Sequence, residues 1–170
     1  MQIADEVARL GGALNTGSTM DASQVTASSL KRTFPALLDI MADVTLRASF
    51  PADEVERQRA SRLASLVQQR ENPNAVASTV MAAVLYGDTH PYGHPEIGTE
   101  ASTKAMTRDD MEKFWKQNFV PNNAALVVSG QITRDELRPL VEKAFGKWEK
   151  GTPAAQTTGE PSTSTARLVL

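Results

Sequence analysis

Residues 10–30 of the chain are LGGALNTGSTMDASQVTASSL, and this stretch predicts the sheet of the fold. Segments 14–20 and 24–30 are rich in Thr and Ser, and their apolar positions include Leu14, Val25 and Leu30. Such segments favour extended structure when turn residues bound them. The polar residues between the two segments are typical of a turn, so we expect an antiparallel hairpin.

A helix is expected just before the hairpin and several are expected after it. Apolar residues recur at helical spacing over residues 2–10, and Gly11-Gly12 supplies the left-handed stop that ends many helices. Further helices are expected between Pro35 and Pro51, over 53–71, after Pro73, and after the capping sequences that begin at Thr107 and Thr133.

Two later segments carry different patterns. Residues 124–130, AALVVSG, are apolar on both faces, which predicts a central strand. Residues 151–166 consist almost entirely of Thr, Ser, Pro, Ala, Gly and Gln, which predicts a flexible linker. Residues 167–170 have the pattern of a strand that the chain end cuts short. Residues 1–150 are therefore expected to form one domain.

Composition excludes several classes of function. The 170 residues are 41% hydrophobic, which suits a globular domain, and the apolar runs of about four or five residues are too short for a membrane span. Residues 1–6 lack the regions of a signal peptide. The net charge of −2, with acids and bases interspersed, does not favour nucleic acid. The chain has no Cys, which excludes disulfides, thiolate zinc sites and a Cys nucleophile.

Both histidines lie in one short loop with two carboxylates, and the four residues are Asp88, His90, His94 and Glu96. Imidazole and carboxylate groups are ordinary zinc ligands, so the loop is a candidate metal site. The Pro and Gly between the histidines exclude the helix that would place residues four apart on one face. The alternative is a loop whose polar residues satisfy its own backbone.

Other catalytic patterns are not found in the sequence. Several carboxylates are expected in first helical turns, where they complement the helix dipole; these are Asp53, Glu54, Asp109, Asp110, Asp135 and Glu136. The sequence contains no Gly-rich phosphate loop and no G-x-S-x-G elbow. No catalytic residue is therefore predicted.

Several segments in order resemble the pitrilysin/insulinase-type zinc metallopeptidases, particularly the bacterial branch similar to mitochondrial processing peptidases. The order of the segments, rather than any single one, carries the resemblance. They lie between about Gln2 and Trp148 and are residues 3–6, 10–15, 37–43, 50–51, 56–59, 85–87, 90–93, 98–99 and 119–130. The resemblance implies an α+β fold, a mostly antiparallel sheet with helices packed on one face. Residues 1–150 would form a metallopeptidase half-domain that lacks its first strands.

The resemblance also implies where such a family holds zinc. An H-x-x-E-H helix, whose Glu activates water, would precede Met1. A third ligand, a Glu, aligns with Ser65, which follows Ala64. Serine cannot replace that ligand, so the resemblance implies a noncatalytic half without metal or catalytic residues, inactive alone. The His90-Pro91-Tyr92-Gly93 segment would then be structural.

The family pairs two homologous halves around a peptide, which implies partners for this chain. One is a catalytic half-domain that carries H-x-x-E-H and zinc, in the same parent chain or in a separate subunit; another is the peptide substrate. Asn15 and Thr16 match the strand that aligns the peptide, so they are candidate substrate-binding residues. An exposed sheet edge favours self-association. The resemblance suggests the bacterial periplasm or cell envelope.

Two other functions remain open at this point. The chain could be a non-proteolytic scaffold or assembly module of the same family. A more remote alternative is a protein that binds a metal through His90 and His94.

Overall fold

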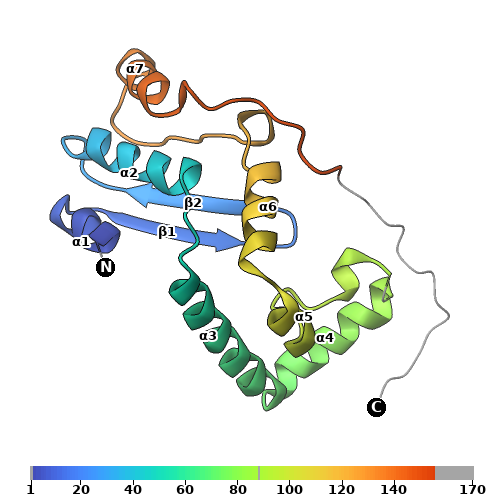
Figure 1. The fold of residues 1–170 in the computed structure, drawn as a ribbon. Helices are drawn as coiled ribbons and strands as arrows, with labels where there is room; N and C mark the ends of the chain where they lie inside the picture. Colours follow the sequence, from blue (N-terminus) through green and yellow to red (C-terminus); the bar gives the residue numbers. More distant parts are fainter. Residues whose placement is uncertain (1, 88, 156–170) are drawn as a thin grey trace. The chain divides into compact units, whose positions relative to one another are not determined.

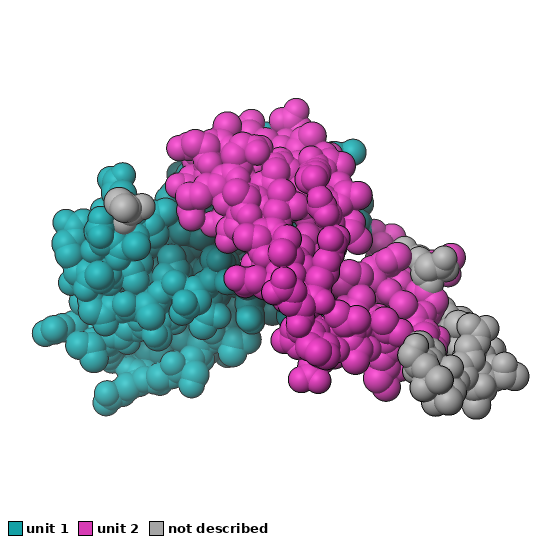
Figure 2. Space-filling view, turned by 90° about the horizontal axis from the view of Figure 1, so that it is seen from below, with its two compact units in different colours: residues 1–49, 112–154 teal, residues 50–111, 155–170 magenta. Residues whose placement is uncertain are grey.

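The computed structural model describes residues 2–87 and 89–155. Contacts divide the chain into two compact units, shown in different colours in Figure 2. Unit 1 contains the described residues of 1–49 and 112–154, and unit 2 contains the described residues of 50–111, which exclude position 88, together with Ala155. The expectation that residues 1–150 form one domain, followed by a linker at 151–166 and a strand at 167–170, stays a prediction; residues 156–170 lie outside the described part.

Unit 1 is built on the hairpin. Helix α1 (Gln2–Arg9) precedes strands β1 (Ala13–Ser18) and β2 (Ser23–Ser28), which pair antiparallel from Ala13 opposite Ser28 to Ser18 opposite Ser23 (Figure 1). The Thr19 amide donates to the Ala22 carbonyl at 2.8 Å across the turn. The hairpin predicted from the sequence is therefore confirmed, and it is the only strand pairing among the described residues.

Helix α2 (Phe34–Leu46) packs its apolar stripe on this hairpin. Leu37 and Leu38 are 1% and 3% exposed, and Val7 of α1 is buried as well. Burying each of these leucines contributes about 2 kcal/mol to folding. The expected α+β class, an antiparallel sheet with helices packed against it, is confirmed: the described residues form seven α-helices and this small sheet.

Polar contacts complete unit 1. The unit also contains most of α6 (Arg108–Asn118), the short turn η2 (Pro121–Asn123) and α7 (Arg134–Phe145). The Trp115 indole donates to the Thr45 carbonyl at 3.0 Å. Thr133 and Glu136 form the predicted capping box of α7, and Lys31 lies 2.8 Å from Glu136. Lys31 and the Thr133 amide together lower the pKa of Glu136 to about 2.

The expected central strand at 124–130 is not formed. Its residues are described but pair with no other described segment, and Leu126 and Val127 are 42% and 88% exposed. A strand exists only where a neighbour accepts its backbone hydrogen bonds, so an apolar pattern alone does not create one. The result is an exposed apolar segment whose backbone pairs with no strand in the part of the chain that the structure describes.

Unit 2 is helical. Helix α3 (Ala52–Arg70) and helix α4 (Pro73–Tyr86) meet at Asn72, whose side chain accepts hydrogen bonds from the first turn of α4. The turn η1 (Pro91–Gly93) and helix α5 (Glu100–Ala105) follow. The Arg59 guanidinium donates to the carbonyls of Thr103 and Met106 at the end of α5, which ties α5 to α3.

We predict that the exposed segment at 124–129 drives self-association of the isolated chain. Val127→Lys should lower the apparent molar mass in size-exclusion light scattering at high concentration, because a charge on an unpaired edge opposes pairing. Gln131→Lys, which adds the same charge at a nearby exposed polar position, should not. A wild-type chain that stays monomeric at every concentration would contradict the prediction.

Candidate functional site

The histidine loop has a structural geometry. His90 is 9% exposed, and its Nδ1 accepts a hydrogen bond from the Tyr92 amide at 3.1 Å, which caps η1. Its ring stacks on Tyr86 at 5.1 Å, and Tyr92 meets both rings edge-on at 5.3 and 5.5 Å. These contacts fit a loop that satisfies its own backbone.

Among the described residues, the candidate ligands His90, His94 and Glu96 do not form a metal-binding group. His94 and Glu96 are exposed, and Asp88 lies outside the described residues. Within residues 2–87 and 89–155, no three His, Asp or Glu side chains lie close enough together to hold a metal ion. One His90 nitrogen is already committed to a backbone amide, so the described residues do not fit a zinc site.

Gly93 explains the shape of this loop. A Cβ atom placed on Gly93 would lie 1.7 Å from the Gly87 carbonyl oxygen, so only glycine allows the two segments to approach this closely. The approach holds η1 against the end of α4. The loop therefore depends on its glycines as well as on its aromatic residues.

The position expected for the third zinc ligand holds Ser65, whose hydroxyl already makes a hydrogen bond. Ser65 lies on the exposed side of α3, and its Oγ donates to the Ser61 carbonyl oxygen at 3.1 Å. Such a bond to the preceding turn is the usual choice of a serine inside a helix. A neutral hydroxyl in this state is a poor substitute for a carboxylate ligand.

The candidate substrate-binding residues lie on β1. Asn15 stands opposite Thr26 and Thr16 opposite Val25, so the two side chains point to opposite faces of the hairpin. Both are exposed. The structure thus places them next to each other on one strand but not on one surface.

The backbone of β1 distinguishes these two residues further. The bond between the Thr19 amide and the Ala22 carbonyl sets the alternation of the ladder. Because hydrogen-bonded and non-hydrogen-bonded pairs alternate along the strand, the amide and carbonyl of Asn15 point toward β2. The amides and carbonyls of Leu14, Thr16 and Ser18 point toward the opposite edge of β1. No described strand pairs with that edge, so the main chain of Thr16 is available to an added strand.

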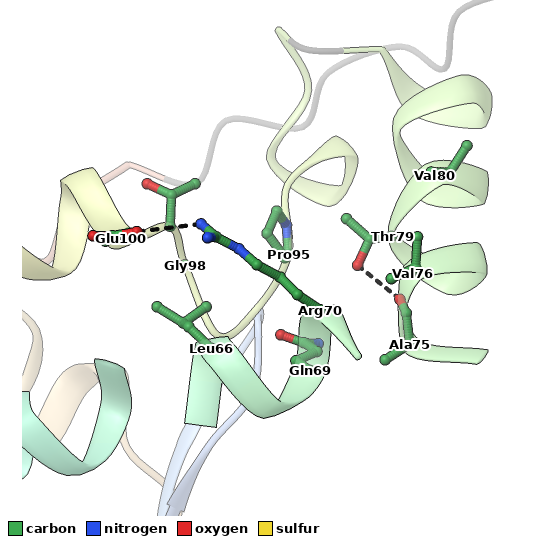
Figure 3. A pocket seen from close by; sticks show the side chains of 11 residues that line it. Leu66, Gln69, Arg70, Ala75, Val76, Thr79, Val80, Pro95, Gly98 and Glu100 are labelled. Atoms are coloured by element: carbon green, nitrogen blue, oxygen red, sulfur yellow. Dashed lines mark hydrogen bonds and ion pairs between the residues drawn. The ribbon is translucent and has the colours of Figure 1, made fainter. Parts of the chain in front are cut away.

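A pocket in unit 2 was not anticipated from the sequence. It has a volume of about 230 Å³ and lies between the end of α3, the start of α4 and the segment 95–100 (Figure 3). Leu66, Val76, Val80 and Pro95 supply apolar walls, and Arg70 and Glu100 stand beside them. The only sequence signal for the pocket was the row of valines on α4, but apolar residues at helical spacing usually indicate a buried helix face rather than a pocket.

Comparison with known proteins gives the family. Residues 1–96 match the family model described as Insulinase (Peptidase family M16), and residues 105–170 match the model described as Peptidase M16 inactive domain. The chain is 30% identical over 163 residues to an uncharacterized zinc protease of Mycobacterium leprae, which covers 94% of the chain and 36% of that protein. It is 26% identical over 147 residues to a probable mitochondrial-processing peptidase subunit beta of Schizosaccharomyces pombe, which covers 85% of the chain and 31% of that protein.

Solved structures agree with this family. A peptidase M16 inactive domain from Pseudomonas fluorescens superposes with a TM-score of 0.86 at 26% identity, covering 94% of the chain and 39% of that structure. A Helicobacter pylori protease at 19% identity has a TM-score of 0.76 and shows the fold alone.

These findings define an insulinase-type peptidase domain. The chain belongs to peptidase family M16, so the resemblance found in the sequence is confirmed. It spans about a third of the length of the relatives it matches, with 36% of the M. leprae protein covered. In the described part of the chain, no helix is long and apolar enough to cross a membrane.

We predict that Gly93→Ala destabilises the loop. The added methyl group would collide with the Gly87 carbonyl, so the free energy of unfolding should fall by about 2 kcal/mol. Urea unfolding followed by circular dichroism measures it. Gly17→Ala is the control, because a Cβ there would meet only the flexible Gln24 side chain at 3.4 Å. Equal effects of the two substitutions would show that the close approach does not matter.

Proposed function

We propose that this chain is part of the noncatalytic half of a zinc metallopeptidase. The observation that carries the proposal is Ser65, a bonded hydroxyl at the position where the family resemblance places a metal-binding carboxylate. The match of residues 105–170 to the inactive-domain model supports the same conclusion. In this proposal zinc and the H-x-x-E-H motif belong to a catalytic half, in the same parent chain or in another subunit.

The role of this half is to complete the peptide-binding chamber. A peptide segment adds by main-chain hydrogen bonds to the edge of β1 that no described strand occupies, with Thr16 as the central residue. This mode needs no charged side chain, which suits a strand whose neighbouring side chains are Asn, Thr and Ser. Asn15 contributes through its side chain only, because its backbone faces β2.

The absence of a zinc site in this half can be tested directly. The purified chain should bind no stoichiometric zinc by metal analysis after dialysis and should not cleave a quenched fluorescent peptide. The reason is that neither Ser65 nor the bonded His90 supplies a ligand set. Stoichiometric zinc together with peptide hydrolysis that a chelator abolishes would overturn the proposal.

A separate experiment tests strand addition at β1. Thr16→Pro removes an amide that does not bond to β2, so the hairpin should persist in circular dichroism while binding of an unstructured, fluorescein-labelled peptide weakens about tenfold. Thr16→Ala keeps the amide and should bind like the wild type. If the Thr16→Pro and Thr16→Ala variants bind the peptide equally well, the main chain of Thr16 does not hydrogen-bond to the peptide. A scaffold module without a peptide site would show no saturable peptide binding that Thr16→Pro removes, so this result also separates the two functions.

A further inference from the structure

The pocket of unit 2 lies against an apolar helix face that nothing described in the chain covers. Helix α4 has no buried residue, and Val76 and Val80, which line the pocket, are 44% and 39% exposed. Leu66, on the facing side of α3, is 8% exposed and forms a firm wall. Apolar surface that borders a pocket favours a ligand that buries it.

The size of the pocket limits what can enter. Its volume of about 230 Å³ is below the roughly 300–1,000 Å³ of pockets for cofactors and drug-sized ligands. It exceeds the roughly 150 Å³ of an engineered apolar cavity that binds benzene. A single branched aliphatic side chain therefore matches the available space, whereas a nucleotide does not.

The rim of the pocket carries a cation, Arg70, that is paired with a carboxylate. In Figure 3 the Arg70 side chain extends from α3 toward Glu100, and the two lie 3.3 Å apart. Lys104 approaches the other oxygen of the same carboxylate at 2.8 Å. Glu100 would therefore keep Lys104 as its partner if Arg70 turned away.

The exposure of these groups makes such an exchange easy. The Arg70 side chain is 69% exposed, and exposed ion pairs contribute little to stability. The hydrogen bond and charge of Lys104, with a smaller contribution from Arg70, hold the pKa of Glu100 below its ordinary value. Glu100 is thus a carboxylate with two cations, and one of them is available to a second carboxylate.

We propose that this pocket binds the carboxyl-terminal residue of a peptide. Its aliphatic side chain lies between Leu66, Val76 and Val80, and its α-carboxylate pairs with Arg70. A carboxyl-terminal Leu or Ile carries both groups on one Cα atom, which matches a guanidinium at the edge of a pocket this small. An arginine also binds a carboxylate through two parallel hydrogen bonds.

The test compares two peptides by fluorescence polarisation. Both have the same labelled sequence ending in Leu, one with a free carboxylate and one with a terminal amide. The free acid should bind the wild-type chain about tenfold more tightly than the amide, because only the acid pairs with Arg70. Arg70→Gln should lower the affinity for the free-acid peptide to the affinity for the amidated peptide. Arg62→Gln, an exposed position on the same helix outside the pocket lining, should leave the preference intact.

Two more variants separate the charge from the pocket. Glu100→Gln removes the competing carboxylate and should tighten binding of the acid, because Arg70 is then released. Ala75→Leu fills the pocket and should weaken the binding of both peptides. Thr16→Pro should change neither result, which distinguishes this site from strand addition at β1.

Several outcomes would overturn the proposal. These are equal affinity for acid and amide, equal effects of Arg70→Gln and Arg62→Gln, and no saturable binding by the wild-type chain. Equal binding by an amidated peptide with Asp beside its Leu would overturn the assignment to the chain end, because an internal carboxylate would then suffice.

Discussion

The close approach of α1, the hairpin and α2 at Gly12 is the constraint on which unit 1 depends. A Cβ atom at Gly12 would lie 2.9 Å from the Ser28 carbonyl and 3.3 Å from the Leu37 side chain. The end of α1, the start of the hairpin and the buried stripe of α2 therefore meet at a point without room for a side chain. Leu37, 1% exposed, fills this point, and its burial orders the elements around it.

The polar groups of the chain mostly serve this scaffold. Glu136 caps α7 and binds Lys31, Arg59 holds the end of α5, and His90 caps η1. These side chains bind backbone groups or form ion pairs. In this member of peptidase family M16 these side chains maintain structure, and the two proposed recognition features are the edge of β1 and the rim of the pocket in unit 2.

Much of this structure could be predicted from the sequence because its signals are local. The hairpin follows from two short Thr-rich segments around a turn, and the capping boxes at Thr107 and Thr133 are visible as spacing alone. The prediction of a central strand at 124–130 was wrong, because an apolar pattern indicates which side chains a strand would bury but not whether a neighbouring strand exists to pair with it. The two histidines suggested a metal, yet the role of His90 depends on its contacts with Tyr86 and Tyr92.

The sequence by itself determined the family through the order of its matching segments, and it determined the hairpin and every described α-helix except α5 (Glu100–Ala105), because capping, periodicity and turn residues act over a few positions. Only the tertiary structure decided which groups are free. It showed that the backbone of Thr16 rather than Asn15 faces the open edge, and that Arg70 stands at the mouth of an apolar pocket. The physical reason is that the direction of each backbone group depends on the register of the hairpin, and the shape of the pocket depends on how α3, α4 and the segment 95–100 pack. Residue spacing records neither.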